Sequence, residues 1–181
     1  MPVVSFCLFN TPIGACAMAW SSDSIAGVLL PEDDPARTRP RMQRRFPGAA
    51  EAMPAPWVAT VIERLQRLLE GRSHDALADV PLDMAGVPAF NQRVYEVART
   101  ILPGQTLSYG EVAARLGDPG AARAVGQALG HNPFAPIVPC HRVLAAGKQS
   151  GGFSAGGGVA TKLRMLQIEK AQLGDGPGLF D

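Results

Sequence analysis

The distribution of apolar residues predicts an N-terminal part made of strands followed by one helix. The segments "VVSFCLF", "ACAMAW" and "IAGVLLP" are separated by the turn-forming "NTPIG" and "SSDS", which indicates a meander over the first thirty residues. In "WVATVIERLQRLLEG" the apolar side chains recur at helical spacing and a glycine closes the segment. The predicted inner stripe of this amphipathic helix consists of Val58, Val61, Ile62, Leu65, Leu68 and Leu69.

The regular spacing of apolar residues is absent between the predicted strands and the predicted helix, and again after that helix. Residues 31–56 are rich in proline, arginine and acidic residues, and we predict a loop. The run "RTRPRMQRRF" holds five arginines; contact with phosphate is one interpretation, and a solvated basic loop is the favoured one. The later segment "DVPLDMAGVPAF" carries two prolines and is typical of a strand or a linker. We therefore place a domain boundary there, with domains 1–86 and 87–181.

The second part is predicted to be helical. The helix in "FNQRVYEVARTIL" has an apolar stripe of Phe90, Val94, Val97 and Ile101. "SYGEVAARLG" opens with Ser108 and has Glu111 three residues later, the pattern of a capping box. A tight turn, "GDPG", precedes the short helix "AARAVGQALG", for which Asp118 is the expected N-cap and Pro119 the first helical residue. Two short helices joined in this way have the form of a helix-turn-helix.

The second of these short helices has two unlike faces. The face predicted to pack inward consists of Ala121, Val125, Ala128 and Leu129. Arg123, Gly126 and Gln127 fall on the other side, where small residues let the helix approach another surface closely. The plain alternative is a surface arginine on an alanine-rich helix.

Composition excludes several classes of protein. The chain has 181 residues, of which 46% are hydrophobic and 18% charged, so it can bury a core. The formal net charge is +1, with a weak positive bias in the second half. No basic residue precedes the apolar N-terminus and no apolar run reaches membrane-spanning length, so we expect a cytoplasmic protein without membrane contact. Three widely spaced cysteines favour a reducing compartment.

Two of the cysteines, Cys7 and Cys16, are interpreted as ordinary strand residues, because no further His or Cys lies at zinc-site spacing. We expect no metal and no cofactor. The third, Cys140, lies in "PIVPCHRVLAAG", where prolines stiffen the chain and His141 follows directly. A thiol is a nucleophile only as a thiolate, and neighbouring side chains of an extended segment point apart. A catalytic pair would therefore need a water or a turn, and both a buried thiol and a nucleophile stay open.

Two flanking residues could support Cys140. Asn132 precedes a proline after the second short helix, and its amide could fix the turn. Glu169 lies on the predicted helix "VATKLRMLQIEKAQL", at the edge of an apolar sector formed by Val159, Leu163, Leu166 and Leu173. Glu169 could orient His141 as the third member of a triad does, or it could be a half-exposed glutamate paired with a lysine. The glycine-rich "SGGFSAGGG" matches no phosphate-binding motif and is interpreted as a loop lining a pocket.

Taken together, "SYGEVAARLG", "RAVGQALGHNP", "NPFAPIV" and "PCHRV" resemble the O6-alkylguanine-DNA alkyltransferases (methylated-DNA–protein-cysteine methyltransferases). The similarity is continuous from about residue 90 to 169, and the motifs occur in the family's order and spacing. The N-terminal part matches loosely, through "TPIG" and the strand–helix pattern. The resemblance implies an α/β plus α protein: an N-terminal ribonuclease-H-like α/β domain followed by a C-terminal winged helix-turn-helix domain.

The resemblance also implies an activity and its residues. The family repairs O6-alkylguanine in double-stranded DNA by irreversible, single-turnover transfer of the alkyl group to its own cysteine after base flipping; O4-alkylthymine is a further candidate substrate. Cys140 corresponds to the acceptor, His141 to a base acting through water, Glu169 to its carboxylate partner and Asn132 to a hinge. Arg123 corresponds to the residue that enters the base stack. Further implied DNA contacts are Tyr109, Ala122, Gln127 and Ser108, and implied pocket residues are Tyr109, Val143, Phe153, Ser154, Lys162 and Ala135.

Departures from relatives concern the range of substrates. Phe153 stands where some members have tyrosine, and Ala135 where some have proline, which should leave a roomier pocket. The zinc ligands of some relatives are not evident. Cys140 argues against a non-catalytic damage binder, in which the cysteine is replaced. A transcriptional regulator would not need "PCHRV", and a cysteine hydrolase would leave Arg123 unexplained. We expect the protein to act as a monomer.

Overall fold

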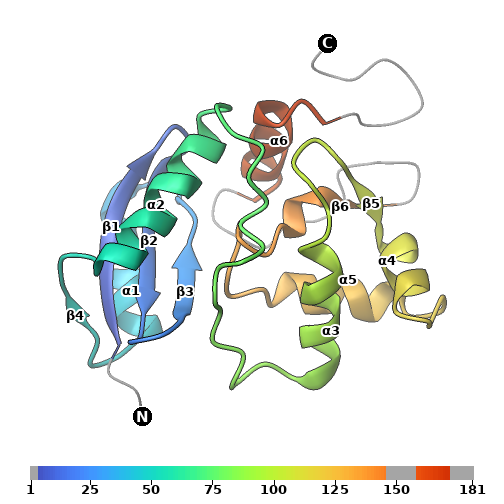
Figure 1. Ribbon diagram of the computed structural model, residues 1–181, viewed down its shortest axis with the longest axis horizontal. Coiled ribbons are helices and arrows are strands. Elements are labelled where there is room, and N and C mark those ends of the chain that lie inside the picture. The colour runs from blue at the N-terminus through green and yellow to red at the C-terminus, as the bar shows by residue number, and fades with distance from the viewer. Residues whose placement is uncertain (1–3, 146–157, 172–181) are drawn as a thin grey trace.

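The computed structural model describes residues 4–145 and 158–171, and its N-terminal half is built on a four-stranded sheet (Figure 1). The predicted meander is confirmed as strands β1 (Ser5–Thr11), β2 (Gly14–Trp20) and β3 (Ile25–Leu29), paired antiparallel. A short strand, β4 (Ala50–Glu51), pairs parallel to β1 and gives the order β3-β2-β1-β4. The sheet presents two buried faces, because successive strand residues point to opposite sides.

A helix covers each face of the sheet. Helix α2 (Pro56–Leu69) packs on Cys7, Phe9, Cys16 and Met18, and all six residues of its predicted stripe are buried. Helix α1 (Thr38–Arg45) places Met42 in a separate cluster with Phe6, Ala17 and Ala19 on the opposite face. Cys7 and Cys16 are buried and free, as predicted for strand cysteines. Burial raises their thiol pKa values to about 11 and about 12, so neither is a thiolate at neutral pH.

The prediction of a loop over residues 31–56 was wrong. A 3-10 turn (Pro35–Arg37) begins where the Asp34 side chain accepts a hydrogen bond from the Ala36 N–H, and α1 follows directly. Only Thr38 and Met42, one turn apart, anchor α1 in the core. Such a helix leaves almost no apolar periodicity in its sequence, because its remaining positions are mostly arginine.

The second half is mainly helical, as predicted. Its helices are α3 (Ala89–Ala98), α4 (Tyr109–Arg115), α5 (Ala122–Gly130) and α6 (Gly158–Ile168), and the short strands β5 (Leu107–Ser108) and β6 (Val143–Leu144) pair in parallel. The capping box is confirmed: Ser108 Oγ accepts from the Glu111 N–H at 3.0 Å, and the Ser108 N–H donates to Glu111 Oε1 at 3.3 Å.

Two details of these helices differ from prediction. Asp118 does not cap α5; its carbonyl accepts from the Ala121 N–H in a turn, and the helix begins only at Ala122. On α6 the buried residues are Lys162, Met165 and Leu166, whereas Val159 is exposed; Leu173 lies outside the described residues. The apolar pattern mislocated this face because a buried lysine occupies its centre.

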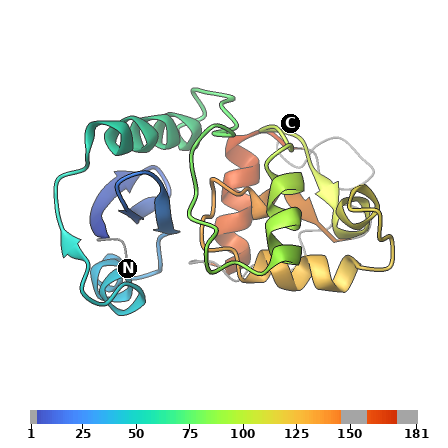
Figure 2. The same cartoon turned by 60° about the horizontal axis from the view of Figure 1, so that its bottom comes forward.

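The sheet half and the helical half lie side by side in both views (Figures 1 and 2). One hydrophobic cluster joins them and includes Met18, Leu65, Val94 and Phe134. The Val28 N–H donates to the Pro133 carbonyl at 3.0 Å, which ties β3 to the turn after α5. The result is a mixed α/β fold, and none of its described helices has the length and apolarity needed to cross a membrane.

Candidate functional site

Cys140 begins a short 3-10 helix, Cys140–Arg142, that connects the turn after α5 to β6. Only 6% of the residue is exposed. The turn is held by Asn132, whose Nδ2 donates to the Val138 carbonyl at 2.8 Å and whose Oδ1 accepts from the Phe134 N–H at 2.9 Å. The prediction that this amide fixes the turn is confirmed.

A buried cluster of charged groups lies beside the cysteine. Glu169 Oε1 lies 2.9 Å from His141 Nε2, the side-chain pairing that the sequence left open against a lysine partner. The same carboxylate accepts two hydrogen bonds from Arg142, from Nη2 at 2.7 Å and from Nε at 3.0 Å. Arg142, for which no role was predicted, is 1% exposed and also donates to the Ile101 carbonyl at 2.8 Å. A signal was available: an arginine in a buried segment requires an anion.

The cluster determines the charge of its members. Burial alone would raise the pKa of Glu169, but His141 and Arg142 together lower it to about 2. An ionised Glu169 only accepts, so we assign the proton of neutral His141 to Nε2. The other ring nitrogen, Nδ1, is buried and has no hydrogen-bond partner among the described residues. This nitrogen therefore carries a lone pair that can accept a proton.

The electrostatics around the thiol follow from burial. Burial raises the pKa of Cys140, while a hydrogen bond from Asn132 and the charge of Lys162 oppose this rise in part. Burial also lowers the pKa of His141 below its ordinary 6.5, although the charge of Glu169 and its hydrogen bond act to raise this pKa. At neutral pH the site therefore holds a neutral thiol and a neutral imidazole, and the thiol needs a base to react.

A second set of contacts connects three predicted pocket residues. Lys162 is fully buried on α6, and its Nζ donates to the Val143 carbonyl at 2.9 Å and lies 5.9 Å from the centroid of the Tyr109 ring. Burial lowers the pKa of Lys162 to about 8. The Tyr109 ring lies against Gly126 of α5, where an added Cβ would be 3.9 Å from its Cδ1 and Cε1. The Tyr109 ring is therefore in ordinary packing distance of α5 at this position.

The other predicted residues are dispersed. Arg123 and Gln127 are exposed on α5 and Ala122 is partly buried there, whereas the Ser108 hydroxyl caps α4. Ala135 is buried and lines a small cavity together with Cys140. Phe153 and Ser154 lie outside the described residues. In the part of the chain that the structure describes, no three His, Cys, Asp or Glu side chains form a group that could hold a metal ion.

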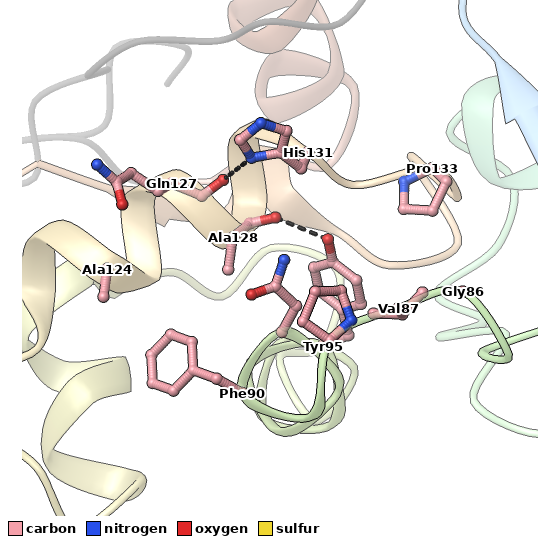
Figure 3. Close-up of a pocket in the computed structure, with 11 residues that line it drawn as sticks. Gly86, Val87, Phe90, Tyr95, Ala124, Gln127, Ala128, His131 and Pro133 are labelled. Carbon is pink, nitrogen blue, oxygen red and sulfur yellow. Dashed lines mark hydrogen bonds between the residues drawn. The ribbon is translucent and has the colours of Figure 1, made fainter.

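A separate hollow of about 490 Å³ lies between residues 86–88, α3 and α5 (Figure 3). At its wall the Tyr95 hydroxyl donates to the Ala128 carbonyl at 2.7 Å, and His131 Nδ1 donates to the Gln127 carbonyl at 2.7 Å. The bond from Tyr95 ties α3 to α5. Cys140 does not line this hollow, so the reactive site lies elsewhere.

Comparison with known proteins gives a consistent result. Residues 89–171 match the family described as "6-O-methylguanine DNA methyltransferase, DNA binding domain". The chain is 36% identical to the methylated-DNA–protein-cysteine methyltransferase of Mycobacterium tuberculosis, over 99% of this chain and 100% of that protein. It is 35% identical to the bifunctional transcriptional activator/DNA repair enzyme Ada of Escherichia coli, over 92% of this chain and 45% of that protein.

Solved structures agree. The crystal structure of M. tuberculosis OGT in complex with DNA matches with a TM-score of 0.76 and 34% identity, covering 92% of each chain. The O6-methylguanine-DNA methyltransferase of Pyrococcus kodakaraensis matches with a TM-score of 0.69 and 25% identity, covering 91% of this chain and 98% of that one. The similarity therefore extends over both halves of the fold.

Proposed function

The chain belongs to the methylated-DNA–protein-cysteine methyltransferase family, and we propose that it repairs alkylated DNA by moving the alkyl group onto its own Cys140. The substrate is O6-alkylguanine in duplex DNA, the reaction is direct reversal, and each protein molecule reacts once. The observation that carries this proposal is the buried Cys140 thiol, which is followed directly by a neutral His141 whose Nε2 is hydrogen-bonded to Glu169.

The first step brings the base to the thiol. A guanine inside a duplex cannot reach the thiol of a residue as buried as Cys140, so the nucleotide must be flipped out at a cost of a few kcal/mol. Exposed Arg123 on α5 would fill the space that the base leaves. Ala122, Gln127 and Ser108 would contact the DNA beside it. The small side chains of α5 would allow the helix to lie close to the duplex.

The second step activates the thiol. His141 Nδ1 would accept the Cys140 proton through one water, because this nitrogen makes no direct hydrogen bond to the thiol among the described residues. Glu169, bound to Nε2, would orient the ring and stabilise the imidazolium that forms. Arg142 keeps that carboxylate ionised. The backbone N–H groups of Cys140 and His141, with Asn132 and Lys162, lower the cost of the thiolate.

The third step is a single displacement. The thiolate sulfur attacks the alkyl carbon, the S–C bond forms, and the C–O6 bond breaks with its electron pair on guanine. The base takes up a proton in exchange for the one that the thiol lost. The product is an S-alkylcysteine, and we infer that none of the site residues can remove the group, which limits each molecule to one turnover.

The remaining pocket residues would hold the flipped base. Tyr109 would contact the base and assist its rotation, and the Val143 carbonyl would accept from the guanine edge with the lone pair that Lys162 does not use. Asn132 would act as the hinge between α5 and the cysteine. The family resemblance also assigns Phe153 and Ser154, which lie outside the described residues, to this pocket, and Ala135 would leave it roomy.

The finer architecture is part of the same proposal. We assign residues 1–86 to a ribonuclease-H-like α/β domain and residues 87–181 to a winged helix-turn-helix domain, in which α4 and α5 form the DNA-binding pair. The helix covering each face of the sheet and the short turn between α4 and α5 support this division. We expect a monomer.

The proposal is tested with a duplex that carries radiolabelled O6-methylguanine. Wild-type protein should take up label, and Cys140→Ala should take up none. Cys7→Ala is the matched control, because Cys7 is also a buried free cysteine and its loss should leave uptake unchanged. Label on Cys140→Ala equal to wild type would reject the proposal.

A further inference from the structure

A small cavity reaches Cys140 from the N-terminal half of the molecule. Its volume is about 160 Å³, and it opens between α1, the end of β3 and the turn that carries the cysteine. Since a cavity needs roughly 10–15 Å³ of such volume to hold one water, this one has room for several small groups. Among its lining residues are Leu29, Leu129, Ala135, Cys140, Arg41 and Arg45.

The cavity is positively charged on its α1 side. Arg45 donates from Nη1 to the Val28 carbonyl at 3.1 Å and from Nη2 to the Pro133 carbonyl at 2.9 Å. Both partners are neutral, and among the described residues no carboxylate forms an ion pair with Arg45. A guanidinium has five N–H donors, and these two bonds use only part of that capacity.

The second arginine is partly neutralised. Arg41 Nε lies 3.1 Å from Glu32 Oε1, and Nη1 donates to the Leu30 carbonyl at 3.4 Å. Burial and the charge of Arg41 both lower the pKa of Arg45, so the local field favours an added anion. Arg45 is therefore the main uncompensated charge of this cavity.

We propose that this cavity receives the distal end of alkyl groups larger than methyl, and that Arg45 favours groups that end in a carboxylate, such as carboxymethyl. This inference rests on the proposed function, because it concerns the group that Cys140 accepts. Leu29, Leu129 and Ala135 would contact the apolar part of the group, while Arg45 would pair with its terminal carboxylate. In the transfer step the S–CH2 bond forms and the CH2–O6 bond breaks, which leaves guanine and S-carboxymethylcysteine.

The test compares three duplexes that differ only in the lesion: O6-methylguanine, O6-carboxymethylguanine and its neutral isostere O6-(carbamoylmethyl)guanine. The measured quantity is the ratio of single-turnover rate constants for the carboxymethyl and carbamoylmethyl lesions. Comparing this ratio between protein variants cancels the intrinsic reactivity of the two lesions. Arg45→Gln should lower the ratio about fivefold relative to wild type, the upper range for a partly exposed ion pair.

Three further variants test whether the positive charge at this position, and not the loss of Arg45 in general, determines the rate ratio. Arg45→Lys keeps the charge and should retain most of the preference. Arg44→Gln, an exposed neighbour on the same helix, should leave the ratio unchanged. Arg41→Gln should lower it to a smaller extent, and it serves as the test if Arg45→Gln does not fold.

The outcomes separate this inference from the proposed function. If wild type repairs O6-methylguanine but the arginine variants keep the wild-type ratio, the inference is wrong and the function stands. Equal slowing of all three lesions by Arg45→Gln would mean that Arg45 only supports the turn at Pro133, and would also overturn it. Failure of wild type on O6-methylguanine would reject the function itself.

Discussion

Glu169 Oε1 lies 2.9 Å from His141 Nε2, and the two side chains are 4% and 1% exposed. A carboxylate removed from water to this extent is stabilised only by charged or hydrogen-bonding partners. His141 supplies one hydrogen bond, and Arg142 neutralises the charge. The pair is therefore part of a three-residue unit in which structural stability and the proposed chemistry depend on the same carboxylate.

Removing the cation of this unit should destabilise the protein. Arg142→Met leaves Glu169 buried without its counterion and the Ile101 carbonyl without its donor. We expect a loss of about 3–5 kcal/mol in the free energy of unfolding, measured by urea denaturation. Arg164→Met, on the exposed side of α6, is the control and should change this free energy by less than about 0.5 kcal/mol. Similar values for the two variants would contradict the assignment of Arg142.

The same unit predicts how stability depends on pH. The pKa of Glu169 is lowered from its ordinary 4.5 to about 2, so its contribution is fully present above about 4.5 and is lost as the pH falls toward 2. Wild-type protein should lose free energy of unfolding across this window. Glu169→Gln should lose less, since it has no carboxyl group to protonate at this position. If the free energy of unfolding fell equally with pH in both proteins, the lowered pKa of Glu169 would be contradicted.

The capping box on α4 should contribute to stability. Ser108→Ala removes the oxygen that accepts from the Glu111 N–H and should cost about 1 kcal/mol in the free energy of unfolding. Glu111→Ala removes the reciprocal bond to the Ser108 N–H. Because the two bonds belong to one motif, the double variant should lose less than the sum of the single losses. Strict additivity would count against this motif.

The proposed role of Arg123 is tested by comparing two substrates. Arg123→Ala should slow repair of O6-methylguanine in duplex DNA far more than reaction with the free base, because only the duplex requires flipping. Arg115→Ala, an exposed arginine at the end of α4, is the matched control and should leave the duplex-to-free-base ratio near that of wild type. Equal loss on both substrates would rule out the flipping role.

Elements with strong apolar periodicity could be predicted from the sequence. The six apolar residues of α2 recur at helical spacing and are all buried, and β1 to β3 are apolar segments separated by turn residues, so pattern and structure agree. Helix α1 could not be predicted in this way, because only Thr38 and Met42 anchor it and arginines fill the rest. The inner face of α6 was misplaced because Lys162 is buried, and a lysine is counted as polar in any apolar pattern.

Site residues that are close in sequence could be predicted, whereas contacts between distant residues could not be derived from the residue pattern. Cys140 and His141 are adjacent in sequence, and Asn132 lies before a proline, so local chemistry pointed to them. The contact between Glu169 and His141 joins residues far apart in the chain, so the residue pattern alone left it open and only the family resemblance assigned it. Arg142 was missed because its two partners, Glu169 and the Ile101 carbonyl, come together only in the fold.

The central claim is that Cys140 accepts one alkyl group and keeps it. Intact-mass and peptide mass spectrometry after incubation with excess duplex containing O6-methylguanine tests this directly. The predicted result is one methyl group per chain, located on Cys140, with no further repair after the protein is consumed. Repair of more lesions than there are protein molecules, or a methyl group on another residue, would contradict the account.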